Sequence, residues 1–254
     1  MIDVCLVSGR RPELLRSTMD SFEKFAFSNF QIKDFFVNID SIFGTEEDEQ
    51  QCVQIIKEYF PSAKIVRSGE ANFTAAVKNL WSRTSANHIF HLEDDWILNE
   101  KIDANLLRMF DGVTKQLCFI CKEKNWDGHA LFSQLQTKKK FLGITINRTL
   151  SPRFSTSPSI IEGNFSRNCA ELMDLNYNPE KQFYKGFNLR LEEYVYPFRS
   201  RLINGKINSN IIEDTGRHWR EKRDIHKQIF FGNNRGKNAG LENYTLGKDP
   251  ETKN

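Results

Sequence analysis

Apolar segments alternate with amphipathic segments over residues 3–92, and this alternation restricts the fold more than any other feature of the sequence. The apolar segments have the length and composition of buried strands and cover residues 3–8, 34–39, 63–66 and 89–92. The segments between them carry apolar residues at helical spacing and predict helices over residues 13–25, 51–59 and 72–82, the second preceded by an acidic loop at residues 46–49. A βαβαβαβ order predicts an α/β fold with a central, mostly parallel sheet flanked by helices.

The fourth predicted strand ends in consecutive carboxylates and an indole, Glu93-Asp94-Asp95-Trp96. Adjacent acids at the end of a buried strand repel each other and lose hydration, so a divalent cation with oxygen ligands is a natural counterion. The acidic first turn of a helix would explain the same residues, because carboxylates favour helix N-termini. We prefer the metal interpretation, since the acids follow an apolar strand and do not open an amphipathic segment. Trp96 is expected to be a core residue, although the floor of an acceptor or sugar site is an alternative role for its indole.

Polar groups also follow the first and second predicted strands. Residues 8–11 read Ser-Gly-Arg-Arg, and Asp40 closes the second strand. Ligands of parallel sheets bind outside the carboxyl ends of the strands. We therefore expect these groups and the acidic strand end to meet at one pocket.

Composition sets a broad frame for the chain. The 254 residues carry a formal net charge of +3, which suits an anionic ligand such as a nucleotide but does not by itself indicate nucleic acid. The five cysteines are odd in number and scattered, which is typical of a reduced, cytoplasmic protein. Cys118 and Cys121 have no second pair at zinc-site spacing and are assigned to an apolar strand. No apolar run is long enough to predict a membrane span.

The pattern is less regular after Trp96. We expect a helix over residues 99–110, a strand over 116–121, a solvated turn at Lys138–Lys140 and a helix over 164–175. A single catalytic domain is predicted over residues 1–231, with a nucleotide-binding half at 1–98 and an acceptor half at 99–231. Residues 232–254 are expected to form a flexible or lid-like tail.

The ordered strand ends resemble those of a GT-A nucleotide-sugar glycosyltransferase. The resemblance rests on three features: a first strand followed by Ser-Gly-Arg-Arg-Pro at the start of a helix, Asp40 at the end of the second strand, and Glu93-Asp94-Asp95 at the end of the fourth. It covers about residues 2–220. It is nearest to family 2-like enzymes, including small viral and bacteriophage ones, for which the host cytoplasm is the expected location. It implies a Rossmann-like nucleotide-diphospho-sugar transferase fold and hexosyl- or pentosyltransferase activity. It also implies a nucleotide-sugar donor, with a UDP-sugar as first choice, and Mn²⁺ or Mg²⁺ as cofactor.

The resemblance also implies which residues bind the donor. Asp40 would accept hydrogen bonds from the base or ribose, although a turn-forming role would explain it as well. Two arginines beside a strand end suit the diphosphate, although a solvated loop would explain Arg10 and Arg11 equally well. Asn72 would contact the donor, but it is equally suited to capping the helix that follows it. The full set of donor candidates is Ser8, Arg10, Arg11, Asp40, Asn72, Lys78, Asn79, Glu93, Asp94 and Arg217.

For the metal, the resemblance implies Asp95, with Glu93 two residues back, and a late histidine, for which His218 is the candidate. A lone histidine is more often structural, and that alternative stays open for His218. His91 lies inside an apolar strand and is expected to be a core residue.

Deprotonation of an acceptor hydroxyl requires a general base. The resemblance places a carboxylate after the metal motif, and the candidates are Glu180, Glu192 and Glu193, with Asp94 as a further catalytic candidate that faces the donor sugar. No clear Glu-Asp pair follows at the family's usual place, so an inverting or a retaining outcome is left open.

The sequence therefore predicts a metal-dependent glycosyltransferase whose acceptor is a glycan, a protein or a modified DNA base. A nucleotidyltransferase is one alternative, but Gly9 alone is a poor match to a glycine-rich phosphate loop. A non-catalytic nucleic-acid-binding protein is another. It would use the basic residues Lys138–Lys140, Arg199, Arg201, Arg217, Arg220, Lys222 and Arg223, but it would not explain the acidic strand end.

Overall fold

The computed structural model describes residues 1–121, 129–141, 144–205, 210–229 and 242–246. The expected tail over residues 232–254 lies outside this part of the chain except for residues 242–246, which form a strand. Within the described residues, no helix has both the length and the apolar character needed to cross a bilayer.

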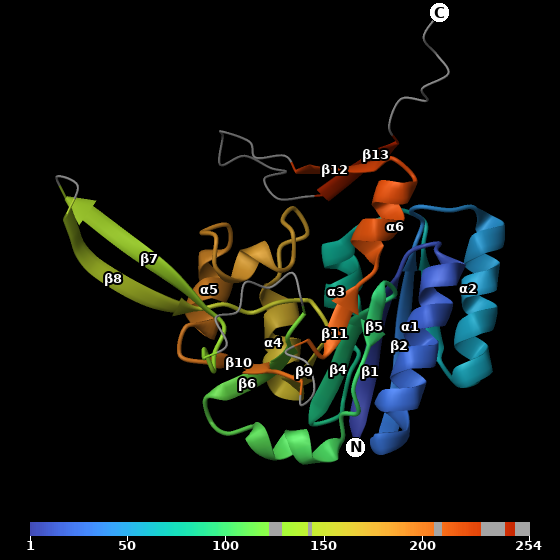
Figure 1. Ribbon diagram of the computed structural model, residues 1–254, viewed down its shortest axis with the longest axis horizontal. Coiled ribbons are helices and arrows are strands. Elements are labelled where there is room, and N and C mark those ends of the chain that lie inside the picture. Colours follow the sequence, from blue (N-terminus) through green and yellow to red (C-terminus); the bar gives the residue numbers. More distant parts are fainter. Residues whose placement is uncertain (122–128, 142–143, 206–209, 230–241, 247–254) are drawn as a thin grey trace, which may run out of the picture.

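A seven-stranded sheet forms the centre of the molecule (Figure 1). Its order is β10-β6-β9-β4-β1-β2-β3, and only β9 runs antiparallel to its neighbours. The predicted α/β fold with a mostly parallel sheet is confirmed. The strands are β1 (Ile2–Ser8), β2 (Ile32–Asp40), β3 (Lys64–Ser68), β4 (His88–Glu93), β6 (Thr114–Phe119), β9 (Ser159–Glu162) and β10 (Arg199–Ile203).

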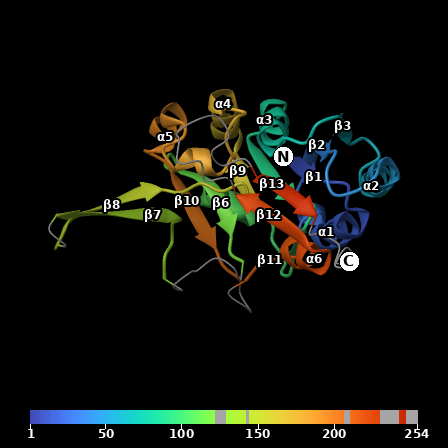
Figure 2. The same cartoon turned by 90° about the horizontal axis from the view of Figure 1, so that it is seen from above.

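Helices cover both faces of this sheet, as Figure 2 shows from above. One core packs α1 (Pro12–Phe25) and α2 (Glu46–Tyr59) against the sheet. The other packs α3 (Phe73–Ser82), α4 (Gly163–Leu172) and α5 (Leu189–Val195) against the opposite face. Every residue of β1 is buried, because both of its faces are covered.

Smaller elements complete the fold. Strand β5 (Trp96–Leu98) pairs antiparallel with β11 (Ile212–Asp214), which leads into the short helix α6 (Gly216–Lys222). Two further hairpins are β7 (Gln134–Phe141) with β8 (Ile144–Pro152), and β12 (Ile225–Ile229) with β13 (Glu242–Leu246). The 3₁₀ turns are Phe27–Asn29, Ala104–Met109 and Lys181–Phe183.

Three local expectations are wrong. Residues 46–49 form the first turn of α2 and not a loop, because Thr45 and Asp48 make a reciprocal capping box. The helix expected over residues 99–110 is reduced to the 3₁₀ turn Ala104–Met109. Lys138–Lys140 lie within β7 and not in a turn. This strand was not predicted because its polar sequence shows little alternation of apolar and polar residues.

Candidate active site

A pocket of about 1050 Å³ lies at the carboxyl ends of the sheet strands. Residues that follow β1, β2 and β4 line it, which is the convergence expected from the sequence. The second half of the chain closes the pocket with residues from several separate segments. Its charged and polar lining includes Ser8, Arg11, Asp40, Asn72, Glu93, Asp94, Asp95, Arg153, Glu180, Asp214 and Arg220.

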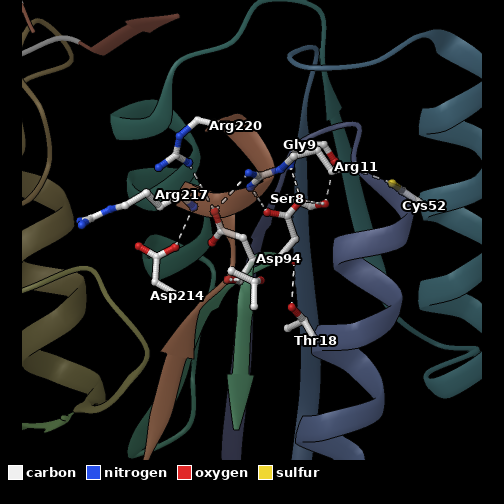
Figure 3. A network of polar contacts seen from close by, with 11 residues as sticks. Ser8, Gly9, Arg11, Thr18, Cys52, Asp94, Asp214, Arg217 and Arg220 are labelled. Carbon is white, nitrogen blue, oxygen red and sulfur yellow. Dashed lines mark hydrogen bonds and ion pairs between the residues drawn. The ribbon is translucent and has the colours of Figure 1, made fainter. Parts of the chain in front are cut away.

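The side chain of Asp94 is turned into the protein toward the β1–α1 turn (Figure 3). One carboxylate oxygen accepts hydrogen bonds from Ser8 Oγ at 3.0 Å and from the Gly9 amide at 2.9 Å, and the other pairs with Arg11. The backbone carbonyl of Asp94 accepts from Thr18 Oγ1 at 2.8 Å. With 1% of its surface exposed, Asp94 joins β4 to the β1–α1 turn. This geometry does not favour the catalytic and donor roles expected for it.

Asp95 is held by a different segment, which is far away in sequence. Its backbone carbonyl accepts from the Thr215 amide at 2.9 Å and from Thr215 Oγ1 at 2.8 Å. Its carboxylate Oδ2 lies 3.1 Å from Arg11 Nη1 and 3.9 Å from Arg220 Nη1. Gly216 packs directly against this carboxylate, because a Cβ on Gly216 would lie 1.9 Å from Asp95 Oδ2.

Arg11 connects the two aspartates and is 5% exposed. Its guanidinium carbon lies 4.8 Å from the ring centre of Phe43 and 5.6 Å from that of Trp219, within the range of cation–π attraction. Phe43 adopts a φ of 73°, a conformation that costs free energy in a bulky residue and that is often found at functional sites. The arginine is therefore a built part of the pocket, and the solvated-loop alternative is wrong for Arg11.

The pocket carries more acidic groups than its arginines neutralise. Burial raises the pKa of Glu93 well above its usual value, and the charges of Asp95 and Asp214 raise it further. The pKa of Asp214 is also raised, first by burial and then by Asp95. Burial and the neighbouring negative charges thus favour the protonated forms of Glu93 and Asp214.

The donor atoms of this cluster fit a hard divalent cation. Glu93, Asp95 and Asp214 all line the pocket and offer carboxylate oxygens. In the part of the chain that the structure describes, no three His, Cys, Asp or Glu side chains are arranged to enclose a metal ion by themselves. Magnesium and manganese sites of enzymes often use one or two carboxylates and complete their shell with substrate phosphates. The arrangement fits that kind of shared site.

Asp40 lies at the end of β2 and lines the pocket. Burial raises the pKa of Asp40 to about 6. Hydrogen bonds from Asn38, Ser68 and the Asn72 backbone act in the opposite direction and lower this pKa. The Asn38 amide donates to Asp40 Oδ1 at 2.7 Å. Asn72 caps α3 by accepting from the Ala75 amide at 2.9 Å, and it also lines the pocket. The position of Asn72 is therefore compatible with both expected roles, helix capping and donor binding.

Several expected site residues are placed elsewhere. Arg10 pairs with Glu49 at 2.8 Å, and Lys78 Nζ donates to the Met173 carbonyl at 2.8 Å. His218 is exposed on α6 and does not line the pocket. The same holds for Arg217, although its backbone amide donates to Asp214 Oδ1 at 3.2 Å. Outside the pocket lining are Arg10, Lys78, Asn79, Glu192, Glu193, Arg217 and His218.

Glu180 is the expected base that does line the pocket, on the wall formed by the second half of the chain. It accepts hydrogen bonds from Tyr184 Oη at 3.1 Å, from Arg153 Nη2 at 3.3 Å and from Ser155 Oγ at 3.4 Å. Burial and the neighbouring Glu180 raise the pKa of Tyr184 to about 12. Tyr184 therefore stays protonated and donates to the glutamate at neutral pH.

Among the pocket residues for which sequence reasoning proposed no donor, metal or catalytic role are Arg153, Tyr184, Asp214 and Arg220. Asp214 and Arg220 lie on either side of the candidates Arg217 and His218, so the neighbourhood was identified although these two residues were not chosen from it. Arg153 and Tyr184 lie in irregular connections and carry no pattern that would have identified them.

The two structural assignments made from the sequence are confirmed. His91 is buried, and its Nδ1 accepts from Trp81 Nε1 at 3.1 Å. Burial lowers the pKa of His91 to about 3, so the ring is neutral. Cys118 and Cys121 are both buried, Cys118 within β6 and Cys121 shortly after it.

No protein-family model and no curated protein sequence matches the chain. Solved structures do resemble it. TarS 1–349 of S. aureus has a TM-score of 0.52 at 14% identity, and the alignment covers 85% of this chain and 60% of that one. The mannosyltransferase PcManGT of Pyrobaculum calidifontis has a TM-score of 0.55 at 8% identity, with 87% and 59% covered. The chain thus spans about three fifths of these proteins and has the GT-A-type fold expected from its sequence.

Proposed function

We propose that this chain is a metal-dependent glycosyltransferase that moves a sugar from a nucleotide-sugar to an acceptor hydroxyl. The observation that carries the proposal is the single pocket where Asp40 and the Glu93–Asp95 segment meet Asp214 and Glu180. The fold comparison supports it, since TarS has been solved with UDP and with UDP-GlcNAc, and PcManGT with GDP-Man and Mn²⁺.

In this proposal, the first half of the chain binds the donor. The ionised carboxylate of Asp40 accepts hydrogen bonds from the nucleoside, and Asn72 borders the same region. One or two of the carboxylates of Glu93, Asp95 and Asp214 would hold the cation, and phosphate oxygens of the donor would complete its shell. When bound, Mn²⁺ or Mg²⁺ would act as a Lewis acid that neutralises the charge developing on the leaving nucleoside diphosphate. Arg11 and Arg220 neutralise part of the acidic cluster and lie where the diphosphate oxygens would approach it.

Glu180 is proposed as the general base on the acceptor side. Its carboxylate would take the proton of the acceptor hydroxyl while the acceptor oxygen bonds to the anomeric carbon and the bond from that carbon to the diphosphate oxygen breaks. Hydrogen bonds from Tyr184, Arg153 and Ser155 would orient the carboxylate.

The test is a thermal-shift panel on the purified protein with UDP, GDP, UDP-GlcNAc and GDP-Man, with Mn²⁺ and with EDTA. A ligand at a hundred times its Kd stabilises a protein by about 2.7 kcal/mol. That stabilisation corresponds to a rise in Tm of roughly 5–10 °C for a chain of this size. We expect one nucleotide class to give such a rise only with metal, and Asp95→Ala to abolish it.

Glu213→Ala is the matched control, because Glu213 is an exposed acid adjacent to the pocket residue Asp214. It should respond like the wild type. Absence of a metal-dependent shift with every nucleotide would contradict the proposal.

A further inference from the structure

Arg11 divides its guanidinium between two adjacent aspartates. Nη2 donates to Asp94 Oδ1, as Figure 3 shows, and Nη1 donates to Asp95 Oδ2 at 3.1 Å. The remaining donor, Nε, is buried and has no hydrogen-bond partner among the described residues. A buried donor without a partner costs stability, and so does the positive φ of Phe43, whose ring packs on this guanidinium. The chain therefore maintains the bridge between the two aspartates at a cost.

The two aspartates depend on Arg11 to different degrees. The second carboxylate oxygen of Asp94 accepts from Ser8 Oγ and from the Gly9 amide, so this side chain stays fixed without the arginine. The contacts of Asp95 with Thr215 are made by its backbone carbonyl and leave the carboxylate free to turn. The orientation of the Asp95 carboxylate is therefore set by its hydrogen bond with Arg11 and by packing.

The groups around this carboxylate gather on one of its oxygens, Oδ2. Arg11 Nη1 lies 3.1 Å from Asp95 Oδ2, and Arg220 Nη1 lies 3.9 Å from it. Gly216 closes a further side, since a Cβ at that position would lie 1.9 Å from the same oxygen. These contacts enclose Oδ2 and leave Oδ1 as the oxygen of Asp95 that a cation in the pocket can approach.

Divalent cations differ in how they use a carboxylate. Ca²⁺ binds about six to eight oxygens at about 2.3–2.6 Å and often takes both oxygens of one carboxylate. Mg²⁺ requires a nearly octahedral shell at about 2.0–2.1 Å, and the two oxygens of one carboxylate lie too close together for adjacent corners of such a shell. Mn²⁺ also occupies octahedral oxygen sites. An aspartate that offers one oxygen therefore favours Mg²⁺ and Mn²⁺ over Ca²⁺.

We propose that Arg11 is a positioning residue that restricts Asp95 to one metal-binding oxygen and thereby makes the site select Mg²⁺ or Mn²⁺ over Ca²⁺. The proposal rests on the metal-dependent function proposed above, with Asp95 as one of the ligands. Arg11 acts through Asp95 and does not touch the cation. Lysine cannot replace it, because an ammonium is a point charge, whereas the planar fork of the guanidinium spans both aspartates.

The experiment measures Mn²⁺ binding to the full-length protein by electron paramagnetic resonance, in which the sharp spectrum of the free ion is lost on binding. Competition with Mg²⁺ and with Ca²⁺ then gives the Kd of each, and the Mg²⁺ preference is defined as the Kd of Ca²⁺ divided by that of Mg²⁺. Arg11→Lys is the test variant and keeps the charge. Arg10→Lys is the matched control, because Arg10 pairs with Glu49 at 2.8 Å and lies outside the pocket lining.

We expect the wild type and Arg10→Lys to have the same Mg²⁺ preference. Arg11→Lys should lower this preference by about tenfold or more, within the range that groups behind a metal ligand control. An unchanged preference in Arg11→Lys would overturn the proposal. So would an equal loss of affinity for Mg²⁺ and Ca²⁺, because Arg11 would then only support the structure.

Gly216→Ala reaches the same oxygen of Asp95 from the other side and leaves Arg11 in place. The new Cβ displaces Oδ2 from its enclosure, so the Mg²⁺ preference should fall in this variant as well. This variant decides the question if thermal unfolding shows that Arg11→Lys does not fold, and a preference equal to that of the wild type would overturn the proposal.

The wild type separates this proposal from the function on which it rests. Absence of Mn²⁺ binding, both without nucleotide and with UDP or GDP, would overturn the metal dependence itself. Binding of Mn²⁺ with equal affinities for Mg²⁺ and Ca²⁺ would overturn the role of Arg11 alone.

Discussion

The two halves of the pocket are built by different means. In the first half, Ser8, Asp40 and the Glu93–Asp95 segment each follow a buried parallel strand, so the sheet itself sets their positions. In the second half, Glu180 and Arg153 lie in connections, and Asp214 ends a strand of three residues. The difference teaches that the first half of the pocket is a property of the fold, whereas the second half depends on local contacts that can vary without disturbing the sheet.

Loss of the carboxylate at Glu180 should have the largest effect. Glu180→Gln keeps the shape and a partial set of hydrogen bonds but removes the proton acceptor. We expect kcat to fall by about 10²–10⁴ while donor binding stays within about twofold, since general base catalysis contributes about that factor. Steady-state kinetics and the thermal shift test this separation.

The controls are Glu192→Gln and Glu193→Gln, on α5 outside the pocket lining. If either of them inactivates the enzyme and Glu180→Gln does not, the acceptor wall has been misassigned.

Gly216→Ala tests how the second half positions a residue of the first half. The new Cβ would lie 1.9 Å from Asp95 Oδ2, so the carboxylate must move. Overpacking costs about 1–3 kcal/mol in stability, and misplacement of a site group by about 1 Å lowers activity by about a hundredfold. The Mn²⁺ concentration for half-maximal activity should rise as well. Gly112→Ala is the control, because no atom lies within 4 Å of the position that a Cβ would take there; similar kinetics for the two variants would show that Gly216 has no positioning role.

Asp40→Asn tests the donor side through its pH dependence. The folded-state pKa of Asp40, about 6, lies above its ordinary value of 3.8. Between these values the folded protein binds more protons than the unfolded chain, so the Asp40 contribution to the free energy of unfolding falls as the pH rises from about 4 to 6, by up to roughly 3 kcal/mol. Urea denaturation should show this slope in the wild type and a flatter one in Asp40→Asn.

The same substitution should weaken donor binding about tenfold near pH 7.5, because a hydrogen bond to a charged acceptor is lost. The wild-type affinity should increase as the pH rises through about 6, as Asp40 ionises. A wild-type affinity that is constant between about pH 5 and 7.5 would argue against contact between Asp40 and the nucleoside.

His218→Ala should have the smallest effect. The imidazole is exposed on α6 and is absent from the pocket lining. We expect activity and the metal requirement to change by less than about twofold. A rise of about tenfold in the Mn²⁺ requirement would instead mean that α6 rotates to bring this side chain to the metal on ligand binding.

The sequence predicts most of the strands and pocket residues in the first half of the chain and fewer of those in the second half. Hydrophobic periodicity located β1, β2, β3 and β4, because strands buried on both faces read as continuous apolar runs. The convergence of Ser8, Asp40 and Asp95 followed from the parallel topology alone.

The direction of individual side chains could not be predicted in the same way. Asp94 and Asp95 are adjacent, yet one joins β4 to the β1–α1 turn and the other faces the pocket, and this depends on Arg11 and Thr215. The hairpin position of Lys138–Lys140 was missed because charged residues in an exposed strand resemble a turn. Contacts of Glu180 with Arg153 and Tyr184 join separate connections, and no local pattern encodes them.

The contact between Asp95 and the segment after β11 also bears on the order in which the protein matures on the ribosome. The first sheet strands and α1 leave the ribosome early and can pair with one another. Thr215, which donates to the Asp95 carbonyl, is synthesised more than a hundred residues later. So is Trp219, whose indole donates to Glu13 at 2.6 Å. A nascent chain can therefore pair its first sheet strands while the acidic cluster is still incomplete, and the pocket is closed around Asp95 only after the segment that follows β11 has been made.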